Sequence, residues 1–327
     1  TREETDRDSQ EDYARALQRS LCVWPSETRR SSDDSIVEDP KKTLWDETLW
    51  GKWEGRYEVN LRTEADRHVW EKDGTEYYCA AVGPETPRPP SVFVSLMKKT
   101  GIDMAVLQSP RSFNRYFSRA VREYPERFIG LCQIEESEAY TEENLEKLRI
   151  YVEDHGLKGL YYDPIPGWEG YENFHTEKYE PLWKEVRALG IPVSPVCYSW
   201  NFEIFIKGYH KLLKKFPNLT LVVVHGFSSK NILEKDNAVR IPEKAIALVK
   251  DNDVYLELLI TTKTKPGTTY GPRDEVIKCL YETFGPDKLI WGSEFARHGP
   301  MYTAAQYAKQ LSYLEERCEY MSKHDVR

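Results

Sequence analysis

Two ionisable residues, His225 and Glu294, each follow a short apolar run that is typical of a buried strand. His225 comes directly after Leu219–Val224, and Glu294 lies just past Leu289–Trp291. Strands that are apolar almost throughout are typical of parallel sheets covered by helices. In a barrel of such strands, catalytic side chains lie at the carboxyl ends. His225 and Glu294 could therefore form an acid–base pair that shares a proton, or an ion pair with a purely structural role.

Other side chains near predicted strand ends could contact a substrate. Arg297 could bind a carboxylate through its guanidinium fork, or it could be a charge on a surface loop. Trp24 could fill the mouth of a barrel or stack against a substrate, and Tyr198, just past Ile191–Val196, is a further candidate for substrate binding. Two further sets of residues lie at the ends of predicted strands. Their side chains could line the mouth of the barrel, face the helices or lie in solvent. The sets are Tyr161, Tyr162 and Asp163, and Gln133, Glu135 and Glu136.

Predicted strands and helices alternate along the chain. Helical patterns separate the strands from residue 91 onward, and a last helix is predicted over Tyr302–Cys318. Alternation of this kind indicates parallel βα units. We therefore expect an α/β fold, a (β/α)8 TIM barrel. The eight predicted strands are Leu21–Trp24, Ile102–Leu107, Phe128–Gln133, Leu157–Tyr161, Ile191–Val196, Leu219–Val224, Val254–Leu259 and Leu289–Trp291.

We expect one barrel domain over residues 1–327, with residues 25–90 as a long Trp-rich insertion between strands one and two. Within the insertion, Arg67–Lys72 and Thr75–Cys79 flank an Asp-Gly pair, which predicts a β-hairpin. A connection of this length is usually a lid, a binding loop or an interface. Its four tryptophans favour packing in a lid or an interface.

Composition excludes several classes of protein. The 327 residues carry a formal net charge of −8 with both signs interleaved, which disfavours nucleic-acid binding because that requires a basic surface. No run of about 18 apolar residues predicts a membrane span, and the first twenty residues lack the apolar core of a signal peptide. The six scattered cysteines, with no CxxC motif, are typical of reduced thiols in a cytoplasmic protein.

Six segments, in their order and spacing, resemble the amidohydrolase-related family that includes aminocarboxymuconate-semialdehyde decarboxylase and the resorcylate decarboxylases. The resemblance implies a metal-bearing barrel with His-x-His at the end of strand one, a histidine at the end of strand five and an aspartate after strand eight. It also implies an acid–base histidine after strand six, which His225 matches. The segments are Met97–Leu107, Tyr124–Gly130, Gly156–Leu160, Phe216–Gly226, Asp253–Glu257 and Phe284–Phe295.

The sequence departs from this family at the metal ligands. Trp24 and Ser26 stand where the resemblance implies His-x-His, and Glu294 stands in place of the aspartate. Val196 or Cys197 stands at the strand-five histidine. Thiolates such as those of Cys22 and Cys197 are good zinc ligands, but their spacing does not support such a site. We therefore expect no metal or other cofactor on this chain.

Two functions remain open. The first is a subunit without the family metal site, paired in a hetero-oligomer with a metal-bearing amidohydrolase paralogue in a hydrolase, lyase or metal-dependent hydroxylase. The divalent metal would then lie on the partner chain. The alternative is a stand-alone, metal-independent lyase or hydrolase, similar to a decarboxylase, for a small carboxylated or aromatic molecule. In that enzyme His225 would transfer the proton, Glu294 would orient it and Arg297 would hold a carboxylate.

Overall fold

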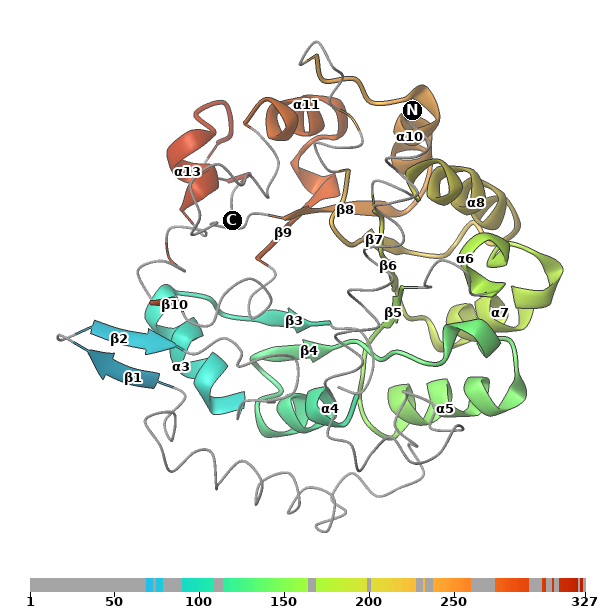
Figure 1. Cartoon of the computed structure of the whole chain (residues 1–327), viewed down its shortest axis with the longest axis horizontal. Helices are drawn as coiled ribbons and strands as arrows, with labels where there is room; N and C mark the ends of the chain where they lie inside the picture. The colour runs from blue at the N-terminus through green and yellow to red at the C-terminus, as the bar shows by residue number, and fades with distance from the viewer. Residues whose placement is uncertain are drawn as a thin grey trace, which may run out of the picture.

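The computed structural model shows strands and helices alternating along the described part of the chain (Figure 1). The first 68 residues, which include Trp24, lie outside the described part, as do several later segments. The structure describes residues 69–72, 75–78, 90–108, 114–163, 169–198, 201–227, 232, 238–259, 274–293, 302–303, 308, 312–322 and 324–325.

Seven parallel strands follow one another in space in the order of the sequence. β5 to β9 form one sheet, and β3 pairs with β4. A parallel bridge between Cys132 and Leu160 joins the end of β4 to β5. The eighth strand expected over Leu21–Trp24 lies outside the described residues. The strands are β3 (Ala105–Leu107), β4 (Phe128–Gly130), β5 (Leu160–Tyr162), β6 (Val193–Pro195), β7 (Leu221–Val223), β8 (Val254–Leu259) and β9 (Leu289–Gly292).

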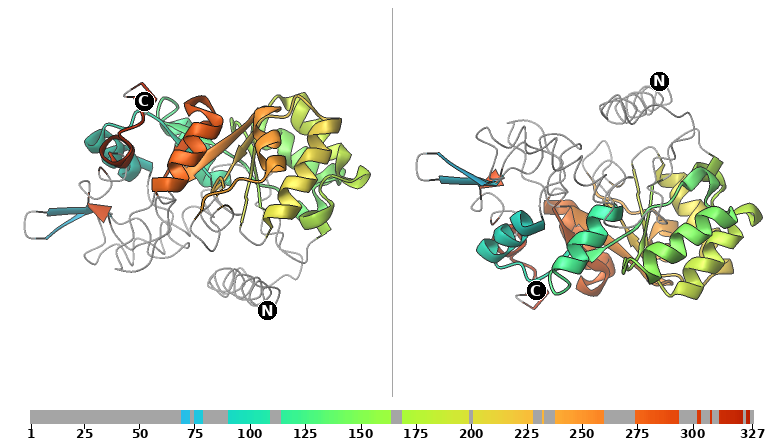
Figure 2. Two further views of the ribbon diagram at one scale, coloured as in Figure 1. Left: turned by 90° about the horizontal axis from the view of Figure 1, so that it is seen from above. Right: turned by 90° about the horizontal axis from the view of Figure 1, so that it is seen from below.

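Helices surround these strands on the outside (Figures 1 and 2). Each of the connections from β3 to β9 contains at least one helix, as a parallel sheet requires. The predicted α/β alternation is therefore confirmed over the described strands. No described helix is long and apolar enough to cross a bilayer. The helices are α3 (Pro90–Thr100), α4 (Asn114–Glu123), α5 (Glu142–Glu153), α6 (Glu169–Asn173), α7 (Glu180–Leu189), α8 (Phe202–Lys215), α10 (Glu243–Lys250), α11 (Asp274–Phe284) and α13 (Tyr313–Arg317).

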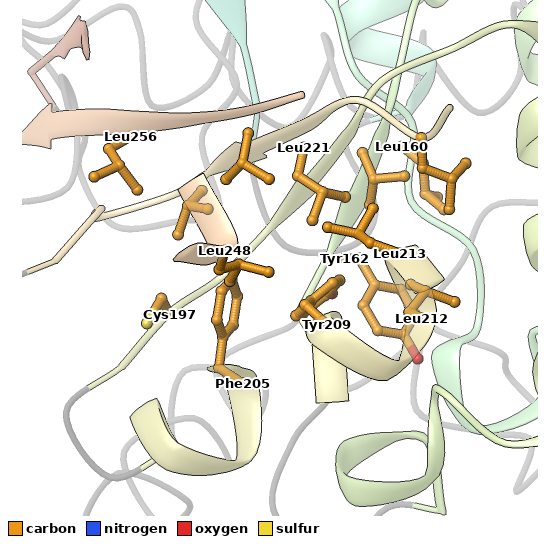
Figure 3. Close-up of a cluster of buried hydrophobic side chains, with 14 of the residues drawn as sticks. Leu160, Tyr162, Cys197, Phe205, Tyr209, Leu212, Leu213, Leu221, Leu248 and Leu256 are labelled. Atoms are coloured by element: carbon orange, nitrogen blue, oxygen red, sulfur yellow. The ribbon is translucent and has the colours of Figure 1, made fainter. Parts of the chain in front are cut away.

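The strands divide the buried side chains into two layers, because successive residues of a strand face opposite sides. In β5, Leu160 and Tyr162 belong to the large core between strands and helices, which Figure 3 shows packed against α8. Tyr161 belongs instead to a separate cluster on the inner face of the strands. The other members of this inner cluster are Leu131, Val196, Val224 and the partly buried Tyr198. The inner cluster therefore lies at or near the carboxyl ends of β4 to β7.

A small antiparallel sheet joins the insertion to a segment that follows the last barrel strand. β1 (Val69–Lys72) and β2 (Thr75–Tyr78) form the predicted hairpin, with Lys72 opposite Thr75. β10 (Tyr302–Thr303) pairs with β2. The predicted helix over Tyr302–Cys318 is therefore wrong at its start, because pairing with a distant strand overrides local helical propensity. Ala308 and α13, towards the end of the predicted range, are helical.

The Asp274 side chain links α11 to α13 through hydrogen bonds. Its carboxylate accepts hydrogen bonds from the Tyr313 hydroxyl and from Nη2 of Arg317, the latter at 2.7 Å. Partial burial raises the pKa of Asp274, but the hydrogen bonds from Tyr313 and Arg317 outweigh it and hold the pKa below its usual value. A carboxyl group with a lowered pKa in the folded state stabilises that state only while it is ionised.

We expect Asp274→Asn to lower the free energy of unfolding by about 0.5 kcal/mol at pH 7, because the ion pair is largely exposed and screened. The contribution is complete above the pKa of an unfolded aspartate, about 3.9. It is lost as the pH falls through the lower pKa of the folded state. Urea denaturation of both proteins between pH 7 and pH 2.5 measures the difference, and a difference that grew in acid would contradict the role of Asp274.

Candidate active site

His225 begins a sharp turn at the carboxyl end of β7. Val224 extends the strand through a bridge to Val196, and His225 then adopts a φ of 64°. Among the described residues it is the only non-glycine with a positive φ. This left-handed conformation costs a residue with a Cβ about 1–2 kcal/mol. Such strain is found most often at functional sites.

Tyr198 lies next to His225 at the end of the neighbouring strand. The two rings are 5.5 Å apart between centroids and tilted by 59°. The backbone N–H of Tyr198 donates to Oδ1 of Asn201 at 2.7 Å, and the Tyr198 hydroxyl donates to Oδ2 of Asp163 at 3.1 Å. The Tyr198 ring is therefore held at both ends and forms a fixed wall beside the imidazole.

Asp163 and Glu136 carry the polar network onward across the ends of β5 and β4. Asp163 is buried, and its N–H donates to Oε1 of Glu136 at 2.8 Å. Glu136 is fully buried and also accepts from Nε2 of Gln133 at 2.5 Å. Gln133 is in turn fixed by two hydrogen bonds with Asn114. A continuous chain of buried hydrogen bonds thus supports the Tyr198 side of the site.

Glu257, in the middle of β8, lies on the other side of His225. Its Oε2 accepts the backbone N–H of His225 at 2.7 Å. Sequence reasoning missed a role for Glu257. The only signal there is one charged side chain between Leu256 and Leu258 in an apolar strand.

The structure brings together some of the predicted site residues and leaves others undescribed. His225 and Tyr198 lie side by side, and Asp163, from one of the two open sets, joins them through Tyr198. Tyr162, from the same set, faces the helices instead. The remaining candidates, Glu294, Arg297 and Trp24, lie outside the described residues.

The residues at the strand-five histidine position do not fit the family metal. Val196 is apolar and packs in the inner cluster. Cys197 faces the opposite way, into the helix-covered core near Phe205 (Figure 3), and burial raises the pKa of its thiol. A metal ligand must be deprotonated and must face the site. Among the described residues, no group of three His, Cys, Asp or Glu side chains could hold an ion.

A small cavity of about 10 Å³ lies between the strands and α8. Its lining includes Val196, Asn201 and Tyr171. Tyr171 is buried, and its hydroxyl has no hydrogen-bond partner among the described residues. Burial raises the pKa of Tyr171, so the hydroxyl stays neutral. An unpaired buried hydroxyl lowers stability, because its hydrogen bonds to water are lost on folding.

We expect Tyr171→Phe to leave the free energy of unfolding unchanged or to raise it by up to about 1 kcal/mol. The matched control is Tyr179→Phe, which removes a hydroxyl that donates to the Ser137 carbonyl at 3.1 Å. That variant should lose about 1 kcal/mol. Urea denaturation measures both. A loss in Tyr171→Phe equal to that of the control would contradict the expectation and indicate a bound water.

The parallel strands are covered by helices, and polar side chains gather at their carboxyl ends, which defines an α/β fold with its candidate site at that end of the strands. Among the described strands, β9 does not pair with β3 to close a ring. A family model described as Amidohydrolase matches residues 64–312, well over half of the sequence. The chain belongs to this amidohydrolase family, whose members are TIM barrels.

Several solved structures are similar to this chain at low sequence identity. A probable 2-pyrone-4,6-dicarboxylic acid hydrolase from Acinetobacter baumannii is 14% identical with a TM-score of 0.50, covering 72% of this chain and 83% of its own. A 2,6-dihydroxybenzoate decarboxylase is 12% identical (TM-score 0.49; 72% and 83%). A 5-carboxyvanillate decarboxylase from Sphingomonas paucimobilis is 13% identical (TM-score 0.48; 76% and 84%). A search of curated proteins finds no match.

Proposed function

We propose that this chain is a lyase or hydrolase that acts on a small carboxylated or aromatic molecule, with His225 as its general acid–base. The position of His225 carries the proposal. An imidazole at the carboxyl end of a barrel strand, in a left-handed turn and beside a fixed tyrosine ring, is placed where barrel enzymes perform chemistry. Histidine is also the side chain that most often serves as a general acid or base near neutral pH.

In a decarboxylation, the bond between the ring carbon and the carboxyl carbon breaks and its electron pair stays on the ring carbon. The His225 imidazolium then gives its proton to that carbon, CO₂ leaves, and solvent reprotonates the imidazole. In a hydrolysis, neutral His225 would instead take a proton from the attacking water. In both reactions the Tyr198 ring, fixed through Asp163, would bound the substrate on one side.

Three further residues complete the proposed site. Arg297 would bind a substrate carboxylate, because a guanidinium group fits a carboxylate bidentately. Glu294 would share the proton of His225, and Trp24 would stack on the substrate or fill the mouth. The observed donor set at Val196 and Cys197 does not fit the family metal, so no step is assigned to a metal.

The test uses the full chain with two probes, 2,6-dihydroxybenzoate for decarboxylation and 2-pyrone-4,6-dicarboxylate for hydrolysis. CO₂ release and ring opening are followed before and after dialysis against a chelator. We expect turnover of at least one probe to persist after chelation. For decarboxylation run in D₂O, one deuterium should appear at the carbon that lost its carboxylate. Complete loss of turnover on chelation, or no turnover of either probe, would contradict the proposal.

The poor fit of the donor set to a metal favours a second candidate function. This chain would then be the non-catalytic partner of a metal-bearing amidohydrolase paralogue, and the metal would lie on that paralogue. Co-expression with such a paralogue, followed by size-exclusion chromatography, tests this candidate. A stable mixed oligomer whose activity survives His225→Asn would support it. A purified chain that is active alone would exclude it.

A further inference from the structure

Glu257 is the only charged residue of β8, and most other residues of this strand are apolar. Leu256 and Leu258 flank it, and both are buried in the core between strands and helices. Glu257 therefore points to the opposite face, toward the barrel interior, where it is partly buried. Moving a carboxylate out of water is unfavourable unless it gains partners. A specific interaction must offset this cost.

One such interaction is with the main chain of His225. Oε2 of Glu257 accepts the His225 N–H at 2.7 Å, the length of a charge-assisted hydrogen bond. His225 has a φ of 64°, which is unfavourable for a residue with a Cβ. A carboxylate that binds this N–H stabilises the left-handed turn at the residue that is the proposed general acid–base.

Two glycines leave space for Glu257, one after β7 and one at the end of β9. A Cβ on Gly226, which follows His225, would lie 2.4 Å from the Glu257 carbonyl oxygen. A Cβ on Gly292, at the end of β9, would lie 2.0 Å from Oε1 of Glu257. Neither glycine could carry a side chain without moving β8 or the carboxylate. The turn at His225, the carboxylate and the end of β9 therefore pack as one unit.

We infer that Glu257 is a positioning residue, which fixes the backbone of His225 so that its imidazole stays beside Tyr198. This inference rests on the proposed function, since it requires His225 to be the acid–base. It adds a main-chain anchor to the side-chain partner proposed for His225, Glu294. Small displacements of a catalytic group can lower the rate about 100-fold, so the anchor should affect kcat more than substrate binding.

The hydrogen bond itself can be tested without any activity assay. In protein labelled with ¹⁵N-histidine, the His225 amide resonance is the one absent from His225→Asn. In Glu257→Ala we expect this resonance to shift and its hydrogen exchange to accelerate by at least about 10-fold, because a hydrogen bond to a charged group is lost. Glu257→Gln keeps an acceptor oxygen and should retain most of the protection.

The kinetic measurement separates positioning from general stability. We expect Glu257→Ala to lower kcat by about 10- to 100-fold while KM changes less than about twofold. Glu257→Gln should recover most of that loss. The control is Leu258→Ala, which weakens the same strand on its outer face but keeps the hydrogen bond. It should leave kcat unchanged at a temperature where all variants are folded.

The outcomes distinguish the inference from the function on which it rests. An unchanged His225 amide in Glu257→Ala would overturn the inference whatever the activity. A shifted amide with unchanged kcat, in an enzyme that His225→Asn inactivates, would also overturn it. If His225→Asn itself leaves turnover intact, the proposed function fails and the positioning role fails with it. A shifted amide together with a fall in kcat supports both.

Discussion

His225→Asn should lower kcat/KM by at least about 100-fold, because a general acid–base contributes roughly 10²- to 10⁴-fold to the rate. Asparagine is the informative replacement. It adopts the left-handed conformation more readily than most residues, and it keeps the backbone N–H that binds Glu257. The variant should therefore fold normally and lose only the imidazole. Turnover is measured with the decarboxylation and hydrolysis probes, and folding by circular dichroism and thermal unfolding.

His210→Asn is the matched control for this substitution. His210 lies on the outer helix α8, where its Nε2 contacts the Lys244 carbonyl at 2.6 Å. This variant should retain full activity, because the residue is remote from the strand ends. A His225→Asn enzyme as active as the control would exclude the acid–base role. Loss of folding in His225→Asn would instead assign His225 a structural role.

Gly226→Ala should lower the free energy of unfolding by about 2–4 kcal/mol. Two effects add. Gly226 has a φ of 50°, which costs alanine about 1 kcal/mol. Its new Cβ would also lie 2.4 Å from the Glu257 carbonyl oxygen, and overpacking of this kind costs about 1–3 kcal/mol. The contact involves backbone rather than a flexible side chain, so relief requires movement of β8. Urea denaturation gives the magnitude.

Gly101→Ala separates the two effects. Gly101 has a φ of 76°, but a Cβ added to it would meet no atom within 4 Å. Its replacement should therefore cost only the conformational term, about 1 kcal/mol. Equal losses in the two variants would mean that the approach of Gly226 to β8 adds no strain. A larger loss in Gly226→Ala would confirm that the turn after His225 fits tightly against β8.

The regular part of the fold could be predicted because its strands are short apolar runs set between helical patterns. Val254–Leu259 has the bounds predicted for it, and β7 lies within the predicted Leu219–Val224. Tyr302–Thr303 could not be predicted, because its strand conformation depends on pairing with β2. The residues around Tyr302 do not indicate that this segment pairs with β2, which is distant in the sequence.

The candidate site was predictable only in part. His225 stands out as a lone histidine after an apolar strand, and Tyr198 follows from its place at a strand end. Alternation along the chain also determines that Val196 faces the inner cluster and Cys197 the outer core. The role of Glu257 depends on a left-handed turn and on the close approach of two strands. Neither can be obtained from hydrophobic periodicity.

The pairing of β10 with β2 has a consequence for biosynthesis. The hairpin precedes the described barrel strands, whereas β10 follows them (Figure 1). While the ribosome is still translating the barrel, one edge of the hairpin therefore has no partner. Unpaired strand edges are templates for aggregation, and such long-range pairings form slowly. Nascent or truncated chains that stop before Tyr302 should accordingly depend more on chaperones than chains that include β10.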